Sequence, residues 1–197
     1  ISNKDIKLVT FILEAGLRCA GSSLKAKEVA FIGAFSALAW ALASLNKLLP
    51  KGVGHVTLDA VFITFLLLLA VQLTGRIGVA TAIGFITGLL MPLLGAKPIA
   101  LVSWSIRGLV IDLVLLATHH KACCLKCCSL AASLGFLAQT LIGNALNIFL
   151  FVNPRAWMMV LTFAVTIALI GSATSIIGAY LIIKLAPRIK QAVGVEA

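Results

Sequence analysis

The sequence predicts an all-α membrane protein with six transmembrane helices in a compact bundle. Hydrophobic residues make up 61% and charged residues 11% of its 197 residues, whereas soluble domains average roughly 45–50% and about 25%. Apolar runs long enough to cross a bilayer, about 20 residues, follow one another along the chain. The runs are continuous rather than alternating, which argues against a barrel of strands. This composition excludes a soluble globular protein and a disordered chain.

Six apolar runs have the length expected of membrane spans. They are Val29–Leu45, Val56–Leu73, Ile77–Ala96, Pro98–Thr118, Ser129–Val152 and Ala156–Ile183. The second run contains Asp59, the fourth contains Arg107 and Asp112, and the other four carry no charge. The sixth run is the longest, so we expect it to tilt or to bend near Gly171 or Gly178.

The basic residues predict the orientation of the bundle. The formal net charge is +10, with 16 Lys and Arg residues. An even number of spans places both termini on one side. If that side is the cytoplasm, only Lys47, Lys51, Lys97 and Arg155 lie outside, and Arg107 lies within a span. Basic residues are concentrated on the cytoplasmic side of membrane proteins, so we expect both termini there.

The chain divides into three segments. Residues 28–186 form the six-helix domain, and residues 187–197 form a cytoplasmic tail. Residues 1–27 contain Ile6, Val9, Leu13 and Leu17 at helical spacing, which predicts an amphipathic segment in the membrane plane or against a cytoplasmic partner. A frayed tail would explain the same residues.

Two charges in the fourth span need partners. Arg107 lies nine residues beyond Pro98, about 14 Å along a helix, and therefore near the middle of a core about 30 Å thick. A charge at this depth is costly unless it faces a partner, a cavity or a bound solute. Asp112 lies about 140° around the helix from Arg107, so we expect each to meet another helix. A structural pair and a ligand-facing group both remain open for Arg107, and for Asp59 we favour an interfacial role.

The fifth span carries four polar side chains, Gln139, Thr140, Asn144 and Asn147. Buried amides hydrogen-bond between membrane helices, so these residues could join helices. Amides also both donate and accept, which suits a neutral polar solute. Asn144 and Asn147 lie in the outer half of this span.

Aromatic side chains and one histidine extend the candidate site. Trp40 and Trp104 lie in the outer halves of their spans, where a flat solute could stack on them. Packing against lipid would explain them equally. His55 lies at the edge of the first outer loop and could contact a ligand there, although an interfacial histidine is the simpler interpretation.

Small residues recur along the first span. Ala30, Ala34, Ala37 and Ala41 fall at helical spacing. Such residues let another helix approach closely, either within this chain or from a different membrane protein.

A cysteine cluster forms the other unusual feature. Cys123, Cys124, Cys127 and Cys128 follow His119 and His120 in a loop that we expect in the cytoplasm. Thiolates and imidazoles suit zinc, but no second, separated pair of cysteines accompanies them. Reduced or lipidated thiols are therefore favoured over a metal site. No pairing of a nucleophile with a base is visible, so we expect no enzyme and no cofactor.

The order of these features resembles the S-components of energy-coupling factor (ECF) vitamin transporters. The run Ile77–Leu90, IGVATAIGFITGLL, resembles that family's glycine-rich third helix. The run Arg107–Thr118, RGLVIDLVLLAT, is similar to its fourth helix, and looks most like the hydroxymethylpyrimidine/thiamine branch. The resemblance covers residues 28–186.

The resemblance implies a multi-pass subunit of a prokaryotic plasma membrane that binds a vitamin-like solute from outside. It implies a transmembrane coupling protein and two cytoplasmic ATPase subunits as partners, and no nucleic acid. Ala30, Ala34, Ala37 and Ala41 would form the docking surface. The solute-binding candidates are Trp104, Arg107, Asn144, Asn147, His55 and Trp40.

Two other functions compete with this one. A self-sufficient secondary carrier or channel would need coupling charges on its path, for which Arg107 and Asp112 qualify. A metal-related membrane protein would use the loop between His119 and Cys128.

Overall fold

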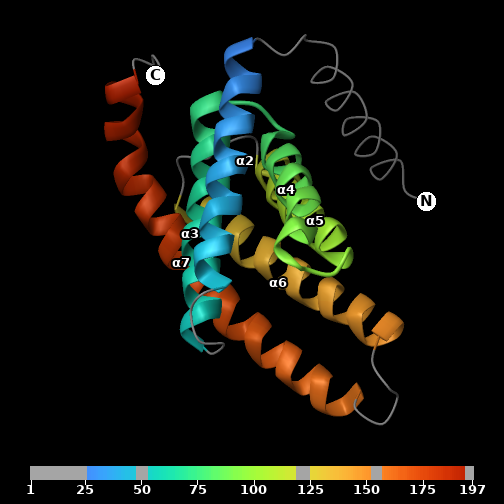
Figure 1. The fold of residues 1–197 in the computed structure, drawn as a ribbon. Coiled ribbons are helices and arrows are strands. Elements are labelled where there is room, and N and C mark those ends of the chain that lie inside the picture. Colours follow the sequence, from blue (N-terminus) through green and yellow to red (C-terminus); the bar gives the residue numbers. More distant parts are fainter. Residues whose placement is uncertain (1–25, 48–52, 119–124, 152–156, 194–197) are drawn as a thin grey trace, which may run out of the picture.

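A computed structural model describes residues 26–47, 53–118, 125–151 and 157–193. The elements are α2 (Ala26–Lys47), α3 (Val53–Thr74), α4 (Val79–Leu90), the 3₁₀ helix η1 (Met91–Leu94), α5 (Ile99–Ala117), α6 (Leu125–Phe151) and α7 (Trp157–Val193). Every element in these ranges is helical, as Figure 1 shows. The all-helical class predicted from the apolar runs is therefore confirmed.

Five of the helices are long and apolar enough to cross a membrane: α2, α3, α5, α6 and α7. The third predicted span is shorter than expected, because α4 has 12 residues and η1 has four. Glycines with left-handed backbone bound this pair, Gly78 at φ 90° and Gly95 at φ 73°. The chain thus has the character of a helical membrane bundle, while six crossings and cytoplasmic termini remain predictions. The predicted amphipathic segment lies outside the described residues.

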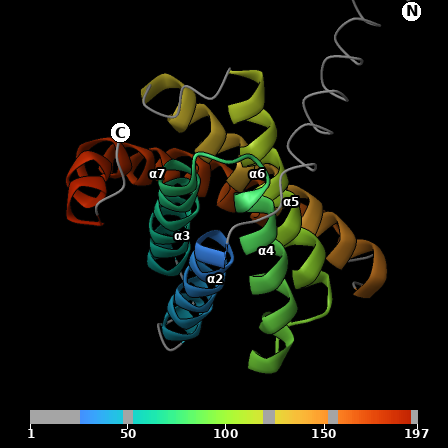
Figure 2. The same cartoon turned by 90° about the horizontal axis from the view of Figure 1, so that it is seen from above.

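The helices pack mainly with their neighbours in the chain. Figures 1 and 2 show α2 beside α3, α4 beside α5, and α6 beside α7. Helix α3 also packs along α7, and the run from Leu66 to Val71 is buried throughout. Because this run is apolar on all sides, α3 is suited to the centre of the bundle.

Glycines bring α4 and α5 into backbone contact. A Cβ atom at Gly108 would lie 2.6 Å from the carbonyl carbon of Ala80 and 2.7 Å from Cα of Thr81. On the facing helix, a Cβ at Gly88 would lie 2.9 Å from Cα of Leu101. Small residues allow this close approach of membrane helices, so the glycine-rich run of the sequence has a packing role.

Several helices begin or end at one end of the bundle. Helices α3 and α5 begin, and α2 ends, at the lower end of the bundle in Figure 1. Helix α6 descends toward the same side, and α7 runs obliquely beside it. By the predicted orientation, this end faces outside.

Candidate functional site

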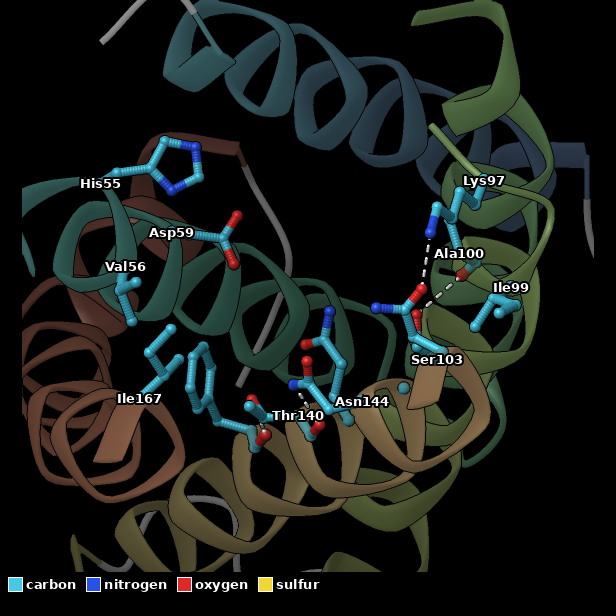
Figure 3. A pocket seen from close by; sticks show the side chains of 14 residues that line it. His55, Val56, Asp59, Lys97, Ile99, Ala100, Ser103, Thr140, Asn144 and Ile167 are labelled. Atoms are coloured by element: carbon cyan, nitrogen blue, oxygen red, sulfur yellow. Dashed lines mark hydrogen bonds between the residues drawn. The ribbon is translucent and has the colours of Figure 1, made fainter. Parts of the chain in front are cut away.

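A cavity of ≈ 390 Å³ lies between α3, α5 and α6, with Ile167 of α7 at one corner (Figure 3). Its volume falls in the range of roughly 300–1,000 Å³ that holds small molecules. Eight polar side chains line it: His55, Asp59, Lys97, Ser103, Gln139, Thr140, Asn144 and Asn147. The cavity therefore combines hydrogen-bond donors, acceptors and both signs of charge.

Arg107 lies behind the wall of this cavity and is fully buried. Its Nη1 donates to Oε1 of Gln139 at 3.0 Å and lies 3.5 Å from Oδ2 of Asp59. Its Nη2 donates to Oγ1 of Thr64 at 2.6 Å and to the Ala60 carbonyl oxygen at 3.4 Å. The guanidinium thus joins α5 to α3 and α6, and it holds two lining side chains in place.

Phe136 separates this guanidinium from α7. The Arg107 guanidinium carbon lies 5.2 Å from the centroid of the Phe136 ring, within the range of a cation–π contact. On the other side, a Cβ at Gly171 would come within 2.7 Å of three atoms of the same ring. Glycine at position 171 therefore makes room for the ring that covers Arg107.

The polar side chains of α6 divide between bonds along their own helix and bonds to other segments. Oγ1 of Thr140 donates to the Phe136 carbonyl oxygen at 2.9 Å, and Nδ2 of Asn144 donates to the Thr140 carbonyl oxygen at 2.7 Å. Asn147 is different, because its Oδ1 accepts a 2.7 Å hydrogen bond from Nζ of Lys97. Figure 3 shows the Asn144 side chain on the cavity side of α6. Of the four polar residues predicted for the fifth span, Gln139 and Asn147 bond to side chains outside α6, so the set joins this helix to its neighbours at two points.

Asp112 has a separate, structural partner. Its Oδ2 accepts hydrogen bonds from the backbone N–H of Thr81 at 2.8 Å and from Oγ1 of Thr81 at 2.6 Å. Thr81 lies in the first turn of α4, where unpaired N–H groups and the helix dipole favour a carboxylate. The expectation that Arg107 and Asp112 face different helices is confirmed. Asp112 therefore belongs to the packing of α4 on α5.

The six predicted solute-binding residues fall into three groups. His55, Asn144 and Asn147 line the cavity. Arg107 lies behind the cavity and positions Asp59 and Gln139. The two tryptophans are not among the lining residues: Trp104 is buried with its backbone against Gly84 of α4, and Nε1 of Trp40 donates to the Leu90 carbonyl oxygen at 3.1 Å.

Sequence reasoning did not assign Asp59, Lys97, Ser103, Gln139 or Thr140 to the site, although all five line the cavity. The charge of Asp59 inside an apolar run was a usable signal, because an opposite charge lay in the fourth span. Lys97 and Ser103 carried no such signal. They reach the cavity because α5 begins beside the C-terminal half of α6.

The remaining sequence candidates lie away from the cavity. Ala30, Ala34, Ala37 and Ala41 all lie on the exposed face of α2. Of the cysteine cluster, Cys127 is half-buried and Cys128 is buried at the start of α6, while Cys123 and Cys124 lie outside the described residues. Within the described ranges, no group of three potential metal ligands is present.

Comparison of the chain with protein-family models, curated proteins and solved structures finds no match.

Proposed function

We propose that this chain is the substrate-binding membrane subunit of an ECF-type importer that captures a vitamin or vitamin precursor from outside the cell. The observation that carries the proposal is the cavity of ≈ 390 Å³ between α3, α5 and α6. It lies at the bundle end that the positive-inside rule assigns to the exterior. The chain binds its solute, and partner subunits supply the ATP hydrolysis.

The chemistry of the cavity supports a small polar solute with an apolar face. Gln139, Asn144 and Asn147 offer amide donors and acceptors along one wall. Phe136 and Ile167 contribute apolar side chains to the lining, against which a flat ring can pack. These features suit a heteroaromatic vitamin or its precursor.

The exposed face of α2 supports a membrane partner. Ala30, Ala34, Ala37 and Ala41 are all exposed on this face and form a stripe of small side chains. A transmembrane coupling protein docks here in this proposal, and two cytoplasmic ATPases drive the cycle. Because small residues permit close helix contacts, a bulky substitution on this face prevents docking.

Native mass spectrometry of the detergent-purified chain, followed by identification of the released small molecule, tests the proposed function. A co-purified vitamin-like mass supports the proposal. An empty chain that also shows no thermal shift across a panel of vitamins and their precursors contradicts it.

Substitutions in the cavity then test the site. Asn144→Ala and Asn147→Ala each weaken solute binding about tenfold or more, since each leaves a buried polar group of the solute without its partner. Thr162→Ala is the matched control, because Thr162 is exposed on α7 and bonds only to its own helix. Unchanged affinity in both asparagine variants would place the solute elsewhere.

A self-sufficient carrier is the second candidate, and the pair of Asp59 and Arg107 beside the cavity favours it. Opposite charges on a solute path can couple transport to an ion or proton. Uptake of the identified solute into liposomes that contain only this chain would establish the carrier. Uptake that requires the coupling protein and ATPases would establish the importer subunit.

A further inference from the structure

A second cavity, of ≈ 340 Å³, lies between α2 and α3. Its walls are apolar except for two side chains, and they consist of Leu42, Leu45, Asn46, Leu58, Asp59, Phe62 and Ile63. Leu45, Leu58 and Phe62 are exposed on the surface of the bundle. In a membrane, this cavity therefore adjoins the lipid rather than the solute cavity, from which α3 separates it.

The two polar side chains in this cavity are both acceptors. Asn46 is 8% exposed, and its Nδ2 donates to the His55 carbonyl oxygen at 3.0 Å. Its Oδ1 is buried and has no hydrogen-bond partner among the described residues. Asp59 of α3 lines both cavities, and its Oδ2 lies 3.5 Å from Nη1 of Arg107. A buried acceptor without a donor is costly, so a ligand that donates is favoured here.

The depth of these acceptors matches the boundary between lipid headgroups and acyl chains. Asn46 is the second-last residue of α2. Asp59 lies six residues into α3, about 9 Å along the helix axis. If α2 and α3 span the bilayer, Asn46 therefore lies close to the membrane surface and Asp59 about 9 Å deeper along α3.

We propose that this cavity binds a phospholipid with a primary ammonium headgroup. The ammonium donates hydrogen bonds to Oδ1 of Asn46 and to the carboxylate of Asp59, and the upper acyl chain packs along Leu45 and Phe62. The negative charge of Asp59 disfavours an anionic headgroup. A choline headgroup carries the same positive charge but has no N–H group for Asn46.

A methylation series tests the proposal in the full-length chain. The purified, delipidated protein is titrated with phosphatidylethanolamine, its N-methyl and N,N-dimethyl forms, and phosphatidylcholine, and bound lipid is counted by native mass spectrometry. We expect one lipid to bind tightly as long as an N–H remains, and about tenfold weaker binding of phosphatidylcholine. Equal binding of all four lipids overturns the proposal.

Variants locate the lipid. Asn46→Leu removes the acceptor and abolishes the preference for ethanolamine over choline. Asn144→Leu is the matched control, because it removes an amide from the other cavity and leaves the preference intact. If Asn46→Leu does not fold, Leu42→Phe fills the cavity while Asn46 remains, and Leu38→Phe places the same ring on the exposed face of α2. Persistence of the preference in the folded Asn46→Leu variant or in Leu42→Phe overturns the proposal.

Discussion

The two faces of α5 meet the rest of the bundle in opposite ways. Toward α4, Gly108 and the glycines of the facing helix bring the backbones into contact, and Asp112 is held at 4% exposure by Thr81. Toward α3 and α6, Ser103 lines a cavity, and Arg107 reaches across the helices to its partners. A single helix thus has a closed side built from small residues and an open side built from long polar ones.

The difference teaches that a charge in a membrane helix does not by itself mark a binding site. Asp112 and Arg107 are equally unusual in an apolar run, yet Asp112 pairs with the start of a neighbouring helix and lines neither of the two cavities described above. Arg107 is also internally paired, but two of its partners, Asp59 and Gln139, line the cavity. The two residues differ in their partners, because Asp59 and Gln139 line a cavity whereas Thr81 lines neither of the two cavities described.

The largest effect is expected at the open side. Arg107→Met leaves the Asp59 carboxylate without its countercharge, and breaking a buried pair in this way costs about 3–5 kcal/mol. The midpoint of unfolding in mild detergent measures the loss. The double variant Arg107→Met/Asp59→Asn recovers most of it, because no unpaired charge remains. A fully stable Arg107→Met would show that the pair does not hold this side together.

Adding one methyl group to α5 tests the close packing on its closed side. Gly108→Ala places a Cβ against the backbone of Ala80 and Thr81, so the helices must separate. Overpacking of this kind costs about 1–3 kcal/mol, which a lower unfolding midpoint records. Gly33→Ala is the control, since Gly33 is exposed on α2 with open space around it, and alanine there stabilises the helix by up to about 1 kcal/mol. If both variants behave alike, close backbone packing is not what joins α4 to α5.

A smaller effect on stability is expected from a substitution at Asp112, on the same side of α5. Asp112→Asn keeps an acceptor for Thr81 but loses the charge at the start of α4, at a cost of about 1 kcal/mol. A double-mutant cycle with Thr81→Val measures the coupling between the two side chains through their unfolding midpoints. Additive losses would contradict the capping role of Asp112.

The smallest effect on stability is expected at the rim of the cavity. Lys97→Gln removes an exposed side chain that bonds to Asn147, and we expect unfolding to change by no more than about 0.5 kcal/mol. Solute affinity falls nevertheless, because Asn147 loses the bond that orients it. Isothermal titration with the identified solute separates the two readouts. A large loss of stability would show that Lys97 stabilises the fold rather than only orienting Asn147 for the solute.

The helical class could be predicted because it depends on composition and on the length of apolar runs. The shortness of this span could not, since Gly78 and Gly95 bound α4 and η1 through left-handed backbone that the apolar pattern of Ile77–Ala96 does not reveal. The cavity between α2 and α3 could not be predicted from the sequence either. It depends on how Leu42 and Phe62 pack across two helices, which periodicity does not specify.

The site was predicted in part, and the reason lies in helix rotation. Asn144 and Asn147 stood out as amides in an apolar run, and both line the cavity. Trp104 stood out equally as an aromatic in the outer half of its span, but its position on α5 aligns with Gly108 and turns it toward α4. Depth along a span follows from counting residues, whereas direction around it depends on packing partners elsewhere in the chain.

The capping of α4 by Asp112 also has a consequence for biogenesis. At 16 residues, α4 and η1 together extend only about 24–32 Å, and α5 carries a carboxylate that favours water until Thr81 bonds to it. Of the two segments, α4 with η1 is the one whose length is marginal for entering the lipid from the translocon alone. As a hairpin they shield each other's polar groups, so we expect them to insert together, and a ribosome stalled between them to hold α4 outside the bilayer.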